Sequence, residues 1–256
     1  MRVVISAGAS GIGKAIANSF ARQGAQVYVC DVDPAAVAWC NENLPGVVAV
    51  EADVADPVSV DAFFERIAAD GERLDVLVNN AGIAGPTGPI ETLDVDEWRK
   101  TIDIDLNSFF YCARRAIPML RANGGGSVVN MASNVAFHGF PLRSPYTASK
   151  WAIIGLTKTM AMELGPDGVR VNALCPGSVE GPRIDRVIEK DAACRGRTVE
   201  QVEAEYKSQN SLRTFARNED IVAMVQFLCS SAGERISGQA IGIDGHTEGL
   251  SLRMDN

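Results

Sequence analysis

The sequence lacks several features that would assign a protein to a broad class. No run reaches the ~18 apolar residues that span a bilayer, so no transmembrane helix is predicted. The apolar run from Val3 to Ile5 is too short for a signal peptide, and we expect a cytoplasmic protein. Positive charge is also scarce: the net charge is −8, which argues against a nucleic-acid partner.

The cysteines form no CxxC pair and no close cluster with histidine. They lie at positions 30, 40, 112, 175, 194 and 229. This spacing is unlike that of zinc ligands, and a chain of 256 residues does not depend on a disulfide framework. We therefore expect no metal site and reduced, structural thiols in a cytoplasmic protein.

Short β-branched runs alternate with helix-like segments along the whole chain. The runs are nearly continuous in apolar character, as in strands covered by helices on both faces. Strands are predicted at 3–6, 26–30, 47–51, 74–78, 127–131, 169–174 and 240–243. Helices are predicted at 12–23, 34–43, 57–69, 96–121, 145–164 and 218–230. This alternation predicts an α/β fold with a doubly wound parallel sheet of about seven strands and helices on both faces.

One long polar segment interrupts this alternation. Residues 178–212 are rich in Arg and Glu and lie between the sixth predicted strand and the last long helix. Open α/β sheets bind ligands beyond the carboxyl ends of their strands, so this insertion is predicted to be a substrate lid with short helices of its own. No linker divides the remainder, and residues 1–256 are predicted to form a single domain.

The first predicted strand runs directly into a glycine-rich turn, SAGASGIG, from Ser6 to Gly13. The backbone N–H groups of such a turn can approach a pyrophosphate, although the spacing is not that of G-x-G-x-x-G and a plain tight turn would also fit. The second strand ends at Asp31, whose carboxylate can accept hydrogen bonds from ribose hydroxyls or can be an exposed acid that opens a loop. Together the two features predict a dinucleotide. Asp31 would repel a 2′-phosphate and is followed by Val32 rather than an arginine, which favours NAD over NADP.

Several motifs in order and spacing resemble the short-chain dehydrogenase/reductase family. They are SAGASGIG at 6–13, NNAG at 79–82, Ser133, YTASK at 146–150, CPG at 175–177 and ISGQAIGIDG at 236–245. The resemblance implies a single NAD(P)-binding domain of Rossmann type that oxidises an alcohol or reduces a ketone with a nicotinamide cofactor. It also implies a homotetramer that associates through long helices.

The resemblance assigns roles residue by residue. Tyr146 would be the general acid/base, Lys150 its activator, and Ser133 the hydroxyl that orients the substrate oxygen. Cofactor contacts are implied for Ser10, Ile12, Asp31, Asp53, Val54, Asn80, Tyr146, Lys150 and Val179. A phenol titrates near ~10, and a cation within ~4–6 Å lowers that value by about 1–3 units, so a lysine four residues along a helix suits activation better than surface decoration.

The chain departs from the family pattern at three positions. Ala7 replaces the first glycine of the turn, a change that we expect nucleotide binding to survive. Asp105 aligns with an asparagine that holds a water next to the lysine. Either the Asp105 charge faces Lys150 and weakens its effect on Tyr146, or the backbone carbonyl holds the water. Gly181 replaces a threonine that contacts the nicotinamide amide, so one hydrogen bond is expected to be lost.

The predicted pocket walls, 134–145 and 178–212, suggest a polar substrate. They and the residue just beyond contribute His138, Phe140, Arg143, Arg183, Arg186, Lys190 and Arg213. Several arginines suit a carboxylate, phosphate or sulfonate. The alternative is that these are solvated lid charges paired with Asp185, Glu189 and Glu203.

The sequence thus predicts an NAD-dependent oxidoreductase that interconverts a secondary alcohol and a ketone by hydride transfer. A polyol, sugar or hydroxy acid is the expected small-molecule substrate. Two alternatives stay open. One is an NADPH-dependent 3-oxoacyl thioester reductase, which Asp31 disfavours. The other is a non-catalytic nucleotide-sensing protein of the same fold, which the intact Ser133, Tyr146 and Lys150 set disfavours.

Overall fold

The protein contains one seven-stranded parallel sheet. The structure is a computed structural model and describes residues 1–247. The strands are β1 (Arg2–Ser6), β2 (Gln26–Asp31), β3 (Val47–Glu51), β4 (Val76–Asn79), β5 (Gly126–Met131), β6 (Val169–Pro176) and β7 (Ala240–Ile243). All six pairings are parallel, and the strand order is β3-β2-β1-β4-β5-β6-β7. The predicted fold class is therefore confirmed.

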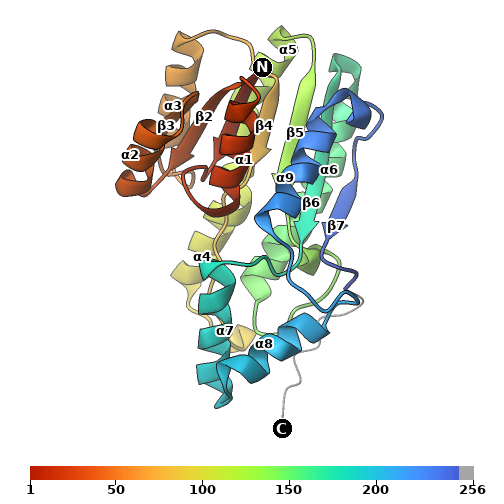
Figure 1. Cartoon of the computed structure of the whole chain (residues 1–256). Helices are drawn as coiled ribbons and strands as arrows, with labels where there is room; N and C mark the ends of the chain where they lie inside the picture. Colours follow the sequence, from red (N-terminus) through yellow and green to blue (C-terminus); the bar gives the residue numbers. More distant parts are fainter. Residues whose placement is uncertain (248–256) are drawn as a thin grey trace.

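Helices cover both faces of this sheet (Figure 1). They are α1 (Gly11–Arg22), α2 (Pro34–Asn43), α3 (Pro57–Ala69), α4 (Val95–Ile102), α5 (Ser108–Ala122), α6 (Ser144–Leu164), α7 (Pro182–Arg195), α8 (Val199–Ser208) and α9 (Asn218–Cys229). Both α2 and α3 begin with proline after an aspartate, and the carboxylates of Asp33 and Asp56 accept hydrogen bonds from the first free backbone N–H groups.

The alternation of side chains along each strand divides the core into two halves. Val4 of β1 packs on the face covered by α3, α5 and α6, with Phe63 and Phe64 of α3. Val3 and Ile5 pack on the opposite face, with residues of α1, α2 and α9. The central strands are apolar on both faces because neither face is exposed to water. The sheet edge from which the loops emerge is thereby held rigidly.

The prediction of one uninterrupted α-helix at 96–121 was wrong. A π-helical turn, Asp103–Asn107, separates α4 from α5. Such a turn inserts extra backbone into a helix and rotates the side chains that follow, a feature often found near functional sites. It includes Asp105, which is fully buried. The predicted fourth strand also begins two residues too early, because β4 starts at Val76.

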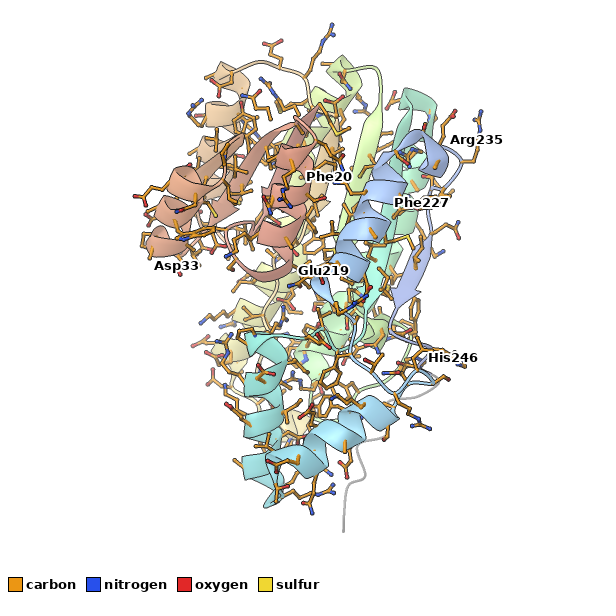
Figure 2. The ribbon with its side chains drawn as sticks, viewed as in Figure 1. Phe20, Asp33, Glu219, Phe227, Arg235 and His246 are labelled. Atoms are coloured by element: carbon orange, nitrogen blue, oxygen red, sulfur yellow. The ribbon has the colours of Figure 1, made fainter. Side chains whose placement is uncertain are left out.

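The lid predicted at 178–212 contains two helices, α7 and α8, which lie beyond the carboxyl ends of the strands (Figure 1). They share a small apolar cluster of their own. Its members are Ile184, Ile188, Ala192, Val202, Tyr206 and Phe215. Figure 2 places His246 beyond the end of β7 on the side of α8, and Arg235 at the other end of that strand. Within residues 1–247, no helix is both long and apolar enough to cross a membrane.

Candidate active site

A cavity of about 540 Å³ opens at the carboxyl edge of the sheet, beneath the lid. Its wall brings together side chains from the glycine turn, the loops after β4, β5 and β6, and helices α6, α7 and α8. Seven of the predicted site residues meet there. They are Ser10, Ile12, Asn80, Ser133, Tyr146, Lys150 and Val179. Segments far apart in the sequence thus form one site because all the parallel strands end at the same edge.

The glycine turn leaves the first turn of α1 open to a ligand. Ser10 is the N-cap residue of α1, but its side chain makes no capping hydrogen bond. A Cβ at Gly13 would overlap the carbonyl oxygen of Ala7, and one at Gly8 would lie 2.6 Å from the Cβ of Val29. The backbone therefore approaches its neighbours too closely for side chains there. Uncapped N–H groups behind a bare backbone fit the pyrophosphate of a dinucleotide.

The hydroxyl of Ser6 and the side-chain amide of Asn80 connect this turn to the loop after β4. The Ser6 hydroxyl accepts hydrogen bonds from the backbone N–H groups of Asn80, at 2.9 Å, and of Ala81, at 3.2 Å. The Asn80 amide donates to the carbonyl oxygens of Ser6 and Ala7. Ala7 has a φ of +48°, the left-handed region in which glycine is favoured. The substitution of alanine for glycine is accommodated, but at the cost of backbone strain.

Asp31 lies at the end of β2 with a carboxylate whose position is fixed. One oxygen accepts from the backbone N–H of Ala9 at 3.2 Å and the other from that of Asp33 at 3.3 Å. Asp31, Asp53 and Val54 do not line the cavity. The Val54 side chain is buried in the core.

Ser133, Tyr146 and Lys150 lie within one region of the cavity wall. Ser133 follows β5, and its hydroxyl accepts a long hydrogen bond of 3.4 Å from the backbone N–H of Val135. Tyr146 and Lys150 lie one turn apart in α6, and the Lys150 Nζ is 5.6 Å from the centre of the Tyr146 ring. Lys150 is almost completely buried and donates to the carbonyl oxygen of Met131 at 3.2 Å. A buried ammonium beside a phenol can stabilise the ionised phenol.

Asp105 faces the same ammonium. Its Oδ2 lies 3.9 Å from the Nζ of Lys150, and its Oδ1 accepts from the backbone N–H of Ile83 at 2.7 Å. The Oδ2 itself has no hydrogen-bond partner. Burial raises the pKa of the Asp105 carboxyl, and the positive charge of Lys150 opposes that rise. Of the two alternatives left open by the sequence, the structure has the geometry of the first, in which the side chain faces Lys150.

The backbone explains the glycine at position 181. Gly181 has a φ of +130°, and it precedes the first residue of α7. Threonine would be strained in this conformation. The departure from the family pattern is therefore linked to the local path of the chain where the lid begins.

The predicted pocket residues divide into two groups. Phe140, Arg143, Arg183 and Arg186 line the cavity, whereas His138, Lys190 and Arg213 do not. The Nε2 of His138 is instead 3.1 Å from the carbonyl oxygen of Thr247. Sequence reasoning did not select Tyr206 of α8, which lines the cavity and whose pKa burial raises to about 12. Its position in the predicted lid was the feature of the sequence that could have marked it as a pocket residue.

The described thiols and acids form no metal site. Among the side chains that the structure describes, which exclude that of Cys194, no group of three or more His, Cys, Asp or Glu could hold an ion. Five cysteines are free thiols, and they are Cys30, Cys40, Cys112, Cys175 and Cys229. The absence of a metal and the cytoplasmic location stay predictions.

Comparisons with known proteins point to one family. The family model described as enoyl-(acyl carrier protein) reductase matches residues 6–247. A 2-dehydro-3-deoxy-L-rhamnonate dehydrogenase (NAD(+)) of a Sphingomonas species is 38% identical over 72% of this chain and 74% of its own length. A trans-4-hydroxycyclohexanecarboxylate dehydrogenase of Sinomonas cyclohexanicum is 36% identical over 98% of this chain and 95% of its own length.

A solved structure supports the same assignment. A short-chain type dehydrogenase/reductase from Mycobacterium ulcerans superposes with a TM-score of 0.85 at 27% identity, covering 95% of this chain and 88% of that one. The matches run through the glycine turn, the loops after the strands and the lid, which together build the cavity. The chain belongs to the short-chain dehydrogenase/reductase family.

Proposed function

We propose that this protein is an NAD-dependent oxidoreductase that interconverts a secondary alcohol and a ketone. The observation that carries the proposal is that one cavity is lined both by Ser133, Tyr146 and Lys150 and by residues of the open glycine turn. The nicotinamide cofactor, when bound, accepts or supplies the hydride.

The chain's own residues supply alignment and a proton path. Tyr146 is proposed to take the hydroxyl proton of the alcohol, or to return it to the ketone oxygen. Ser133 is proposed to hold that oxygen by a hydrogen bond, since its hydroxyl makes only long contacts of 3.4 Å within the protein. Lys150 contributes a buried positive charge 5.6 Å from the centre of the Tyr146 ring.

Asp31 supports NAD over NADP. Its carboxylate is held by the backbone N–H groups of Ala9 and Asp33, at the end of the strand where an adenosine ribose would lie. A 2′-phosphate there would meet a fixed negative charge. The relative from Sphingomonas carries NAD(+) in its name, which agrees with this choice.

The lining of the cavity and the names of the relatives both support a small polar substrate. The wall carries arginines as well as apolar side chains such as Phe140 and Val187. The relatives named above act on a deoxysugar acid and on a hydroxycyclohexane carboxylate. We therefore propose a polyol, sugar or hydroxy acid.

A 3-oxoacyl thioester reductase is the second candidate. The description of the matching family model names a reductase of acyl-carrier-protein substrates. Such an enzyme would be expected to use NADPH, and Asp31 opposes the phosphate of that cofactor. Comparing the two cofactors therefore separates the candidates.

A homotetramer is proposed for the assembly. Apolar side chains are exposed on the two long helices, including Phe110 of α5 and Trp151 and Met162 of α6, the last with 82% of its surface accessible. Such exposure is favourable when another subunit covers it. Light scattering during size exclusion tests this, and a monomer would contradict it.

The test of the function is a spectrophotometric assay. The protein is mixed with NAD and a panel of sugars, polyols and hydroxy acids, and NADH absorbance is followed. We expect turnover with at least one class and a clear preference for NAD over NADP. Turnover confined to NADPH and 3-oxoacyl thioesters would favour the second candidate. Nucleotide binding without turnover on any substrate would favour a non-catalytic nucleotide sensor.

A further inference from the structure

Three arginines in the cavity wall form no ion pair with a described acid, although the positive charge of Arg183 acts on the carboxyl of Asp105. Arg143, Arg183 and Arg186 line the cavity, and none forms an ion pair with an acid of residues 1–247. Other lid cations do form such pairs: Arg195 bonds Glu205, and Lys207 bonds Glu203 at 2.7 Å. Glu203 and Glu205 are therefore paired with cations outside the cavity wall and do not neutralise its arginines.

Arg143 is the best positioned of the three. It is the N-cap residue of α6, three positions before Tyr146, and both residues line the cavity. One guanidinium nitrogen donates to the Thr87 hydroxyl at 2.7 Å, which fixes the group. Its Nε is shielded from solvent and has no acceptor. A fixed guanidinium with unused donors is built to receive an anion.

The acids in the same wall leave this charge unbalanced. Asp244 already accepts hydrogen bonds from the backbone N–H groups of His246 and Thr247. Glu180 lies within range of the positive charge of Arg217. Neither acid pairs with Arg143. Phe140 lies next to the arginine in this wall, because the backbone N–H of Arg143 donates to its carbonyl oxygen at 3.3 Å.

We propose that Arg143 is the anchor for a carboxylate group of the substrate. The substrate is then a hydroxy acid, or the corresponding oxo acid, with an apolar frame between its carboxylate and its secondary hydroxyl. Arg183 and Arg186, both exposed at the start of α7, line the same cavity and add positive charge to it. This inference rests on the proposed function, because it names the substrate class of the same cavity.

The test compares ligands that differ only in charge. Cyclohexanecarboxylate, cyclohexanecarboxamide and cyclohexyl phosphate are titrated into the protein saturated with NADH, and cofactor fluorescence reports binding. The proteins are the wild type, Arg143→Gln, Arg143→Lys and Lys190→Gln. Lys190 is an exposed lysine of α7 outside the cavity wall, so its variant removes the same charge from the lid without touching the site.

We expect the wild type to bind the carboxylate at least ten-fold more tightly than the carboxamide. This preference should vanish in Arg143→Gln, return in part in Arg143→Lys, and persist in Lys190→Gln. Equal affinity for acid and amide, no binding of the acid, or a preference retained in Arg143→Gln overturns the proposal. Tighter binding of the phosphate ester overturns the carboxylate as the substrate class.

Failure of the proposed function gives a different result. A protein that does not bind NADH contradicts the cofactor assignment, whatever the carboxylate does. The same three ligands are then compared by the shift that they cause in the midpoint of thermal unfolding, since a ligand that binds the folded state raises it. A carboxylate shift that depends on Arg143 would support the anion site by itself, and its absence would overturn it.

Discussion

The Oδ2 of Asp105 lies 3.9 Å from the Nζ of Lys150, with both side chains buried beside the cavity that Tyr146 lines. The pair is close enough for the negative charge of Asp105 to offset part of the positive charge of Lys150. The same Nζ lies 5.6 Å from the centre of the Tyr146 ring, so Asp105 and Tyr146 both face one ammonium. This arrangement makes Asp105 a positioning residue for the reaction that we propose.

Replacing Asp105 with asparagine should shift the pH profile of alcohol oxidation. Asp105→Asn replaces the carboxyl beside the Lys150 ammonium with a neutral amide of nearly the same size. Burial raises the pKa of the Asp105 carboxyl, and we expect the part of the kcat/KM pH profile that depends on its titration to be absent from the variant. Asp103→Asn is the matched control, because Asp103 lies in the same π-helical turn and bonds Asn107. A profile that moves equally in both variants, or in neither, contradicts the electrostatic role.

Removing the hydroxyl of Tyr146 should remove the acid/base group. We expect Tyr146→Phe to lower kcat by about 10²–10⁴-fold while NADH binding stays measurable by fluorescence, because the ring remains. Tyr111→Phe removes a hydroxyl from α5 outside the cavity and should leave kcat unchanged. Turnover at the wild-type rate in Tyr146→Phe would exclude this residue as the base.

Exchanging Asp31 for serine should weaken the preference for NAD. The substitution removes the charge that opposes a 2′-phosphate and leaves a hydroxyl for the ribose. We expect the ratio of kcat/KM for NAD over NADP to fall by at least ten-fold. Asp33→Ser makes the same charge change two residues away and keeps an N-cap on α2, because serine caps helices well. An unchanged ratio in Asp31→Ser would mean that another group selects the cofactor.

Relieving the strain at Ala7 should stabilise the fold. Its φ of +48° costs a residue with a Cβ roughly 1 kcal/mol, part of which glycine gives back through the flexibility of the unfolded chain. We expect Ala7→Gly to raise the free energy of unfolding by about 0.5 kcal/mol in urea titrations. Ala21→Gly, within α1, should lower it by about 1 kcal/mol instead. A loss of stability in Ala7→Gly would show that the methyl group is needed.

Buried thiols should make the fold sensitive to alkali. Burial raises the pKa of Cys30 to about 12, whereas a thiol in the unfolded chain titrates near ~8.5. Between these values the unfolded chain has lost the proton and the folded one keeps it, so stability falls as pH rises. The stabilisation that comes from keeping the Cys30 thiol protonated is fully present below the unfolded pKa of ~8.5 and is lost as the pH rises toward about 12.

Urea unfolding at pH 9 and pH 10 measures this effect. We expect the wild type to lose about 1 kcal/mol more than Cys30→Ala between the two pH values. Comparing each protein with itself cancels the packing cost of the substitution. Parallel losses in both proteins would assign the alkaline sensitivity to other groups.

Local sequence signals determined the architecture. The apolar runs gave the bounds of β3 and β7, and the Asp-Pro pair at the start of α3 placed that helix correctly. These signals are local because strand burial and helix capping depend on neighbouring residues. The order of the motifs along the chain likewise indicated the family and placed Ser133, Tyr146 and Lys150 in one predicted site.

The partners of charged side chains were decided by tertiary structure alone. The sequence offered Glu203 as a partner for the pocket arginines, but Glu203 pairs with Lys207. It left the direction of Asp105 open, and the π-helical turn sets that side chain against Lys150. An ion pair depends on distances of a few ångströms between segments far apart in the chain, and only the packed sheet and its loops fix such distances.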